Sequence, residues 1–119
     1  MQVQPIKISC LLTDFIEQSV EDKFKLNILR MVQEQLNNIV KHANATTVII
    51  ELSQNQHFIV LAIKDNGEGF DTSLKRDGIG IENIKKRAAS YEGIAEVISA
   101  PGAGCELIVT FPVPPIAHT

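Results

Sequence analysis

Cysteine, histidine and positive charge are all scarce in this chain of 119 residues. Its two cysteines and three histidines show no metal-ligand spacing, which argues against a metal centre built from them. Cys10 and Cys105 each lie in an apolar, strand-like run, so we expect buried, reduced thiols and no disulfide. The formal net charge of −3 argues against a nucleic-acid backbone as partner.

Long hydrophobic runs are also missing. The apolar runs are far shorter than the roughly 20 residues of a membrane helix, and the N-terminus shows no signal-peptide pattern. We therefore expect no membrane contact by this domain. The length, with 45% hydrophobic and 21% charged residues, predicts a single globular domain over residues 1–119. Its core should run from about 6 to 112, between loose ends.

Three common catalytic signatures do not occur. There is no Gly-x4-Gly-Lys-Ser/Thr phosphate loop, and no Gly-x-Ser-x-Gly nucleophile elbow. The dinucleotide fingerprint is incomplete at Gly78, because Asn83 stands where its third glycine belongs. These absences argue against P-loop proteins, α/β-hydrolases and dinucleotide binders.

The hydrophobic pattern that is present predicts strands and helices in a mixed order. We expect strands at 6–12, 47–53, 57–64, 94–99 and 106–111, and helices at 22–43 and 81–91. Asn44 is placed to end the long helix, and a helical turn fits between 14 and 21. This pattern predicts an α/β fold, a two-layer α/β sandwich with one mixed β-sheet and helices on one face.

The long helix has two contrasting sides. The stripe expected to face the core is Leu29, Val32, Leu36, Ile39, Val40 and Ala43. The opposite side carries first Phe24, Ile28 and Met31, and then Glu34, Asn38, Lys41 and His42. A solvated face is the simple interpretation, but a side that changes from apolar to polar indicates that something covers it. An asparagine oxygen suits Mg²⁺, a lysine suits phosphate, and a glutamate can act as a base.

Two glycine-bearing segments follow. Asp65 ends an apolar strand and precedes Gly67 and Gly69, so a fixed carboxylate could accept a hydrogen bond from an amine on a flat ring. A polar β-turn is the alternative interpretation. Residues 78–81, Gly-Ile-Gly-Ile, lead into the second helix, whose N-terminus would favour an anion. A flexible linker is the alternative there. Residues 101–104 read as the turn of a closing hairpin.

Taken in order, these segments resemble the ATP-binding domain of the gyrase, chaperone, histidine kinase and mismatch-repair ATPase superfamily. The resemblance is greatest to the catalytic domain of sensor histidine kinases of the nitrate-sensor type. Residues 33–43 are similar to the N box of that family, 65–71 to its G1 box and 78–88 to its G2 box. The short segment 72–77 between the last two resembles the short ATP lid of this type.

The resemblance implies roles for individual residues. Asn38 matches the Mg²⁺ ligand, and Asp65 matches the acceptor for the adenine amino group. Catalytic roles are implied for Glu34, Asn38 and Lys41, with Glu34 matching a water-activating base. The other implied contacts to ATP are Lys41, His42, Gly67, Gly69, Phe70, Gly78, Ile79, Gly80, Ile81 and Gly104. Cys105 departs from the family pattern, in which a small polar residue often follows the last glycine.

A phospho-acceptor is not evident. His42, His57 and His118 do not precede an acidic residue on a long helix, as family acceptors do. The resemblance therefore implies ATP or ADP as ligand, a histidine-bearing dimerisation domain as acceptor, and a response regulator downstream. It also implies a cytoplasmic location, including the cytoplasmic part of a membrane-bound sensor. The alternatives are a stand-alone serine kinase of the anti-sigma type and a non-catalytic nucleotide-sensing module.

Overall fold

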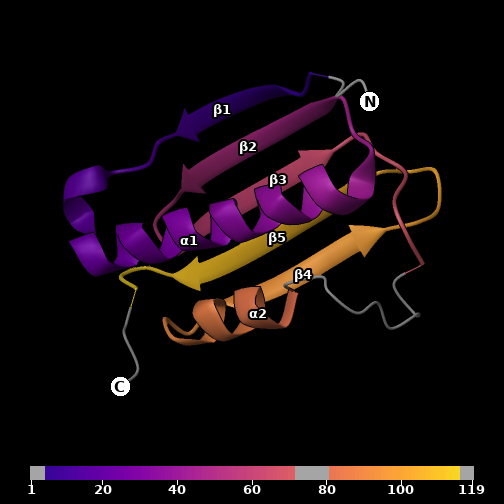
Figure 1. The fold of residues 1–119 in the computed structure, drawn as a ribbon. Coiled ribbons are helices and arrows are strands. Elements are labelled where there is room, and N and C mark those ends of the chain that lie inside the picture. Colours follow the sequence, from indigo (N-terminus) through magenta and orange to yellow (C-terminus); the bar gives the residue numbers. More distant parts are fainter. Residues whose placement is uncertain (1–4, 72–80, 116–119) are drawn as a thin grey trace.

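The structure is a computed structural model that describes residues 5–71 and 81–115. Within them, five strands form one sheet (Figure 1). These strands are β1 (Lys7–Thr13), β2 (Thr47–Gln54), β3 (Phe58–Asp65), β4 (Ile94–Ser99) and β5 (Cys105–Pro112). They lie in the order β1-β2-β3-β5-β4, with β1 and β2 parallel and the other neighbours antiparallel. The predicted mixed sheet is confirmed.

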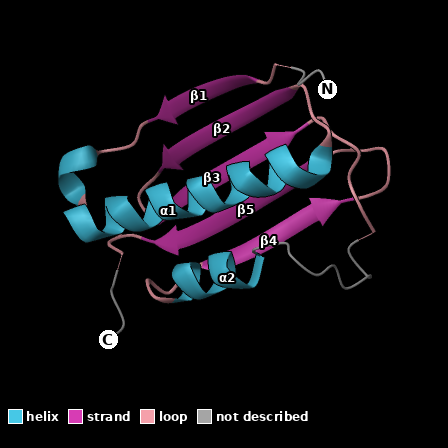
Figure 2. Cartoon of the chain, viewed as in Figure 1, coloured by secondary structure: helices cyan, strands magenta, loops and turns pink. Residues whose placement is uncertain are grey.

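Helices cover one face of this sheet. Helix α1 (Asp22–Asn38) continues into a π-helical turn, η2 (Ile39–Ala43), and the second helix is α2 (Ile81–Ala89). Asn44 ends the first segment in the left-handed conformation, with φ 51°. A 3₁₀ turn, η1 (Glu17–Ser19), joins β1 to α1. Figure 2 shows α1 and α2 on the same side of the strands, which confirms the predicted two-layer sandwich.

The core lies between the helices and the middle strands, where side chains alternate between the two faces of the sheet. The inward-facing pairs of β3 and β5 are, in order, Ile59–Phe111, Leu61–Val109, Ile63–Leu107 and Asp65–Cys105. The first three pairs are apolar and at most 1% exposed. The last pair continues the same row but places a buried carboxylate beside a thiol. At this end of the two strands, the apolar core therefore gives way to side chains that carry ionisable groups.

The rotation of α1 corrects one prediction. Of the predicted core stripe, Leu29 is 51% exposed and Val40 is 67% exposed. Ile39 of that stripe is buried as predicted, but the buried residues of α1 itself are Phe24, Asn27, Ile28, Met31 and Gln35. The ring of Phe24 packs edge-on against Tyr91 and Phe111, at centroid distances of 5.1 and 5.0 Å. This aromatic cluster turns the Phe24 side toward the sheet, and Val32, Leu36 and Ala43 of the predicted stripe are only partly buried against the core.

Strand β1 corrects a second prediction. Cys10 is exposed, because β1 is the edge strand and all seven of its residues are exposed. Cys105 is buried, as predicted, and both thiols are free. Among the helices of the described residues, none is long and apolar enough to cross a membrane.

Candidate functional site

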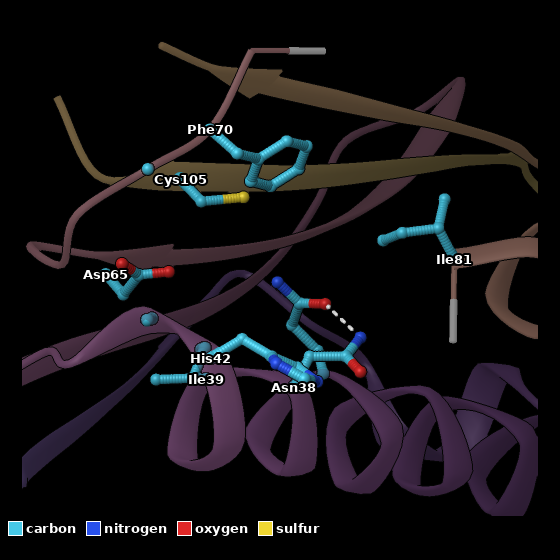
Figure 3. Close-up of a pocket in the computed structure, with 10 residues that line it drawn as sticks. Asn38, Ile39, His42, Asp65, Phe70, Ile81 and Cys105 are labelled. Carbon is cyan, nitrogen blue, oxygen red and sulfur yellow. Dashed lines mark hydrogen bonds between the residues drawn. The ribbon is translucent and has the colours of Figure 1, made fainter. Parts of the chain in front are cut away.

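A pocket opens between the C-terminal part of α1, the turn η2 and the polar ends of β3 and β5 (Figure 3). It contains about 420 Å³ of empty space, part of which is open solvent. Its lining residues are Gln35, Asn38, Ile39, His42, Ala43, Asp65, Gly69, Phe70, Ile81 and Cys105. The fold thus brings together these predicted site residues: Asn38, His42, Asp65, Gly69, Phe70 and Ile81.

The other predicted site residues lie differently. Glu34 and Lys41 belong to the same helical segment but are not among the lining residues of the described part, and Lys41 is exposed. Gly67 and Gly104 lie in the loops behind the pocket wall. Outside the described residues are Gly78, Ile79 and Gly80. The roles implied for all of these residues stay predictions.

Asp65 stands at the end of β3 and is 3% exposed. Its Oδ1 accepts a hydrogen bond from the Gly67 N–H at 2.8 Å. Its Oδ2 is buried, and among the described residues no group donates to it. Burial raises the pKa of Asp65, and the hydrogen bond from Gly67 opposes that rise. Because a buried oxygen without a donor is unfavourable, this atom suits a ligand that supplies an N–H or O–H group.

The loop after β3 is fixed by its own contacts. Asn66 Oδ1 accepts hydrogen bonds from the N–H groups of Thr46 and Thr47, both at 2.9 Å. A Cβ added to Gly67 would collide with the carbonyl oxygen of Ala43. The glycine therefore lets the loop lie directly on the end of η2. This backbone packing alone explains why residue 67 is a glycine. Sequence reasoning missed Asn66, because its residue type is ordinary in a turn.

The helical wall of the pocket carries an amide and an imidazole. Figure 3 shows Asn38 and His42 on this wall, with Asp65 and Phe70 on the strand side. Asn38 Nδ2 donates a hydrogen bond to Gln35 Oε1 at 3.2 Å, drawn as a dashed line in Figure 3. Within residues 5–71 and 81–115, no group of three or more His, Cys, Asp or Glu side chains is placed to hold a metal ion.

Gln35 and Cys105 line the pocket, although sequence reasoning did not place either in the site. A signal for Gln35 was present in its spacing. It lies four residues after Met31 and continues the buried side that begins at Phe24. A glutamine at that position is polar where the core pattern calls for an apolar residue. Such a break in the pattern is typical of functional sites.

Comparison with known proteins assigns the family. The sequence model of the family described as histidine kinase-, DNA gyrase B-, and HSP90-like ATPase matches residues 25–115. That range contains every residue that lines the pocket. The chain belongs to this ATPase family. It is an ATP-binding catalytic domain of the kind found in sensor histidine kinases.

Individual relatives agree with this assignment. The sensor histidine kinase LiaS of Bacillus subtilis (strain 168) is 36% identical over 114 residues, which cover 94% of this chain and 31% of LiaS. The sensor protein VraS of Staphylococcus haemolyticus (strain JCSC1435) is 31% identical over 111 residues, covering 92% of this chain and 31% of VraS. This chain therefore spans about a third of the length of these relatives.

A solved structure supports the fold. The histidine kinase domain of the blue-light activated histidine kinase from Erythrobacter litoralis EL346 matches with a TM-score of 0.71 at 17% identity. The match covers 91% of this chain and 52% of that chain. The arrangement of helices and strands around the pocket is thus shared with a kinase domain of distant sequence.

Proposed function

We propose that this domain serves a two-component sensor histidine kinase, in which it binds Mg²⁺-ATP and presents the γ-phosphoryl group to a histidine of a separate dimerisation domain. A response regulator would then receive the phosphoryl group. The carrying observation is the buried Oδ2 of Asp65, which has no donor among the described residues. The amino group of adenine is such a donor on a flat ring. Ile39, Phe70 and Ile81 offer the ring apolar contact in the same pocket.

Asn38 is our candidate for the Mg²⁺ ligand. It lines the pocket, and its amide oxygen is a hard ligand of the kind that Mg²⁺ prefers. In proteins Mg²⁺ usually takes one or two side-chain ligands and completes its shell with phosphate oxygens and water. A single side-chain ligand is consistent with this preference, since the described residues contain no cluster of three or more potential metal ligands. Bound Mg²⁺ would neutralise phosphate charge, with Lys41 and His42 as candidate contacts and Glu34 as the candidate base.

The acceptor histidine is proposed to come from another domain. His42 lines the pocket. His57 is exposed. It was predicted to begin a strand, but β3 begins one residue later, at Phe58. His118 lies outside the described residues. The names of the relatives favour a histidine kinase over an anti-sigma-type serine kinase or a nucleotide-sensing module. A cytoplasmic location is part of the same proposal.

Calorimetric titration with ATP tests the adenine contact. Asp65→Asn keeps the size of the side chain but puts an NH₂ group at one of the two oxygen positions, where it faces another donor, either the Gly67 N–H or the ligand amine. We expect ATP binding to weaken by roughly 1–3 kcal/mol. Asp22→Asn is the control, because its carboxylate is fully exposed, at 101%, and is not among the lining residues of the described pocket. Equal affinity in wild type and Asp65→Asn would refute the assignment.

Radiolabelled ATP tests the transfer step. The chain alone should gain no acid-labile label, whereas an added histidine-bearing dimerisation domain should become labelled. That reaction should be slow and concentration-dependent, because tethering, which raises effective concentration to roughly the millimolar range, is missing. Label on the chain itself would make one of its own histidines the acceptor. Phosphoserine on a protein partner would favour the serine kinase, and binding without transfer would favour the sensing module.

A further inference from the structure

Gln35 is a buried amide on the side of α1 that faces the sheet. It is 3% exposed and follows the apolar residues Ile28 and Met31 along that side. Burying an amide costs free energy unless hydrogen bonds compensate for the lost water. The partners of this side chain therefore indicate why a glutamine occupies a core position.

The polar neighbours of Gln35 lie on two elements that the pocket separates. On the helical wall, Gln35 Oε1 accepts the hydrogen bond from Asn38 Nδ2 at 3.2 Å. On the strand side, the buried Cys105 thiol lines the same pocket as Gln35. Burial and the charge of Asp65 raise the pKa of this thiol to about 11, and the polar side chains of Ser99 and Gln35 oppose the rise. The hydrogen-bond partner of Gln35 is thus Asn38, and both side chains line the pocket opposite Cys105.

The bond to Asn38 has a chemical consequence. The two ends of an asparagine amide have nearly the same shape, but only the oxygen binds a cation, while the NH₂ group repels it. An acceptor at Gln35 Oε1 attracts the NH₂ end, and the oxygen of Asn38 then lies at the other end of the planar amide, directed away from Gln35 Oε1. An apolar residue at position 35 would remove this preference for one orientation.

We propose that Gln35 is a positioning residue for the metal side of the nucleotide site, because it holds the Asn38 amide in the orientation that offers its oxygen. The inference rests on the proposed function, since it requires that Asn38 bind Mg²⁺. The measurable quantity is the metal linkage, defined as the ratio of ATP affinity with saturating Mg²⁺ to ATP affinity with a chelator. Adenosine affinity serves as the reference, because adenosine carries no phosphate to bridge a metal.

Gln35→Leu should lower the metal linkage about three- to tenfold, the effect expected for the loss of one hydrogen bond. Adenosine affinity should stay within about twofold of wild type. Asn38→Ala should abolish the linkage, which sets the lower limit of the scale. Gln33→Leu is the matched control, because it makes the same substitution at an exposed position of the same helix and should leave the linkage unchanged.

Gln35→Glu separates positioning from a merely structural role. The carboxylate keeps an acceptor for Asn38 Nδ2, so the linkage should survive. Stability should fall, because a second buried carboxylate would lie in the pocket that holds Asp65. Gln35→Leu should show the reverse, with retained melting temperature and reduced linkage. A merely structural role would instead make linkage follow stability in both variants.

The outcomes distinguish this inference from the proposed function. Normal linkage in both wild type and Gln35→Leu would overturn the role of Gln35 alone. A parallel fall in adenosine affinity would also overturn it. Absence of linkage in wild type would overturn the metal part of the proposed function, and the inference with it. If Gln35→Leu shows no folded circular dichroism spectrum, Gln35→Met, which also lacks the acceptor, replaces it in the same titrations.

Discussion

At one end of the sandwich, aromatic rings fill the space between α1 and the sheet, whereas at the other end the same helix and strands surround a pocket. We call these the closed end, defined by Phe24, Tyr91 and Phe111, and the open end, defined by Gln35, Asp65 and Cys105. Both ends use inward-facing positions of the same elements. The backbone pattern therefore does not distinguish them, and the difference lies in the side chains.

That difference separates stability from binding. At the closed end, Phe24 touches two other rings edge-on and is 0% exposed, which stabilises the fold through apolar burial and ring contacts. At the open end, a buried carboxylate oxygen lacks a donor among the described residues. Such an atom destabilises the free domain and becomes useful only when a ligand supplies the donor.

The largest effect should come from emptying the closed end. Phe111→Ala removes a fully buried ring that contacts Phe24, and we expect a loss of about 3–5 kcal/mol in the free energy of unfolding. Phe58→Ala is the control, because Phe58 is 48% exposed. It should cost less than about 1 kcal/mol. Urea unfolding of both variants measures the two losses, and equal losses would contradict this assignment of the core.

A smaller effect should come from disturbing the loops behind the open end. Gly104 and Gly102 both have positive φ, 72° and 79°, but only at Gly104 would an added Cβ collide, with the carbonyl oxygen of Asp65. Gly102→Ala should cost about 1–2 kcal/mol from backbone strain alone. Gly104→Ala should cost about 2–4 kcal/mol, because crowding is added to strain.

Gly104→Ala should also weaken ATP binding, since the collision displaces Asp65, whereas Gly102→Ala should bind ATP as wild type does. Urea unfolding and calorimetric titration of the two variants measure both quantities. If the two substitutions have the same effect on stability and binding, the contact between Gly104 and the Asp65 backbone does not shape the site.

The contrast between the two ends also explains what sequence reasoning could reach. Helices and strands were predicted well because their periodicity is local, and the order of the motifs indicated the family. The rotation of α1 was not predicted correctly, because the helix carries two adjacent apolar stripes. A contact distant in sequence, between Phe24 and the rings of Tyr91 and Phe111, decides between them.

The same limit applied to single residues. Gln35 was missed because a glutamine on a helix is usually exposed, and only the corrected rotation places it in the pocket. Cys10 lies in a strand with an apolar pattern, but its burial depends on whether a helix covers that strand. Strand β1 is at the edge of the sheet, and its residues are exposed.

The smallest effect, and the one of opposite sign, should come from Asp65→Asn in the absence of nucleotide. Burial raises the pKa of Asp65 above its ordinary value of 3.8. The folded state therefore holds the proton more tightly than the unfolded state does. The resulting stabilisation is fully present below about pH 4 and is lost as the pH rises through the raised pKa. Asparagine does not titrate, so Asp65→Asn should gain stability relative to wild type over that range.

Urea unfolding of both proteins between about pH 3.5 and pH 7 measures this difference. With saturating ATP at neutral pH the order should reverse, because the ligand stabilises the protein that binds it more tightly. If, without nucleotide, the stability of wild type increases relative to that of Asp65→Asn as the pH rises, the folded carboxylate already has a donor. The buried carboxylate of Asp65 would then not destabilise the free domain, and the open end would not differ from the closed end in this respect.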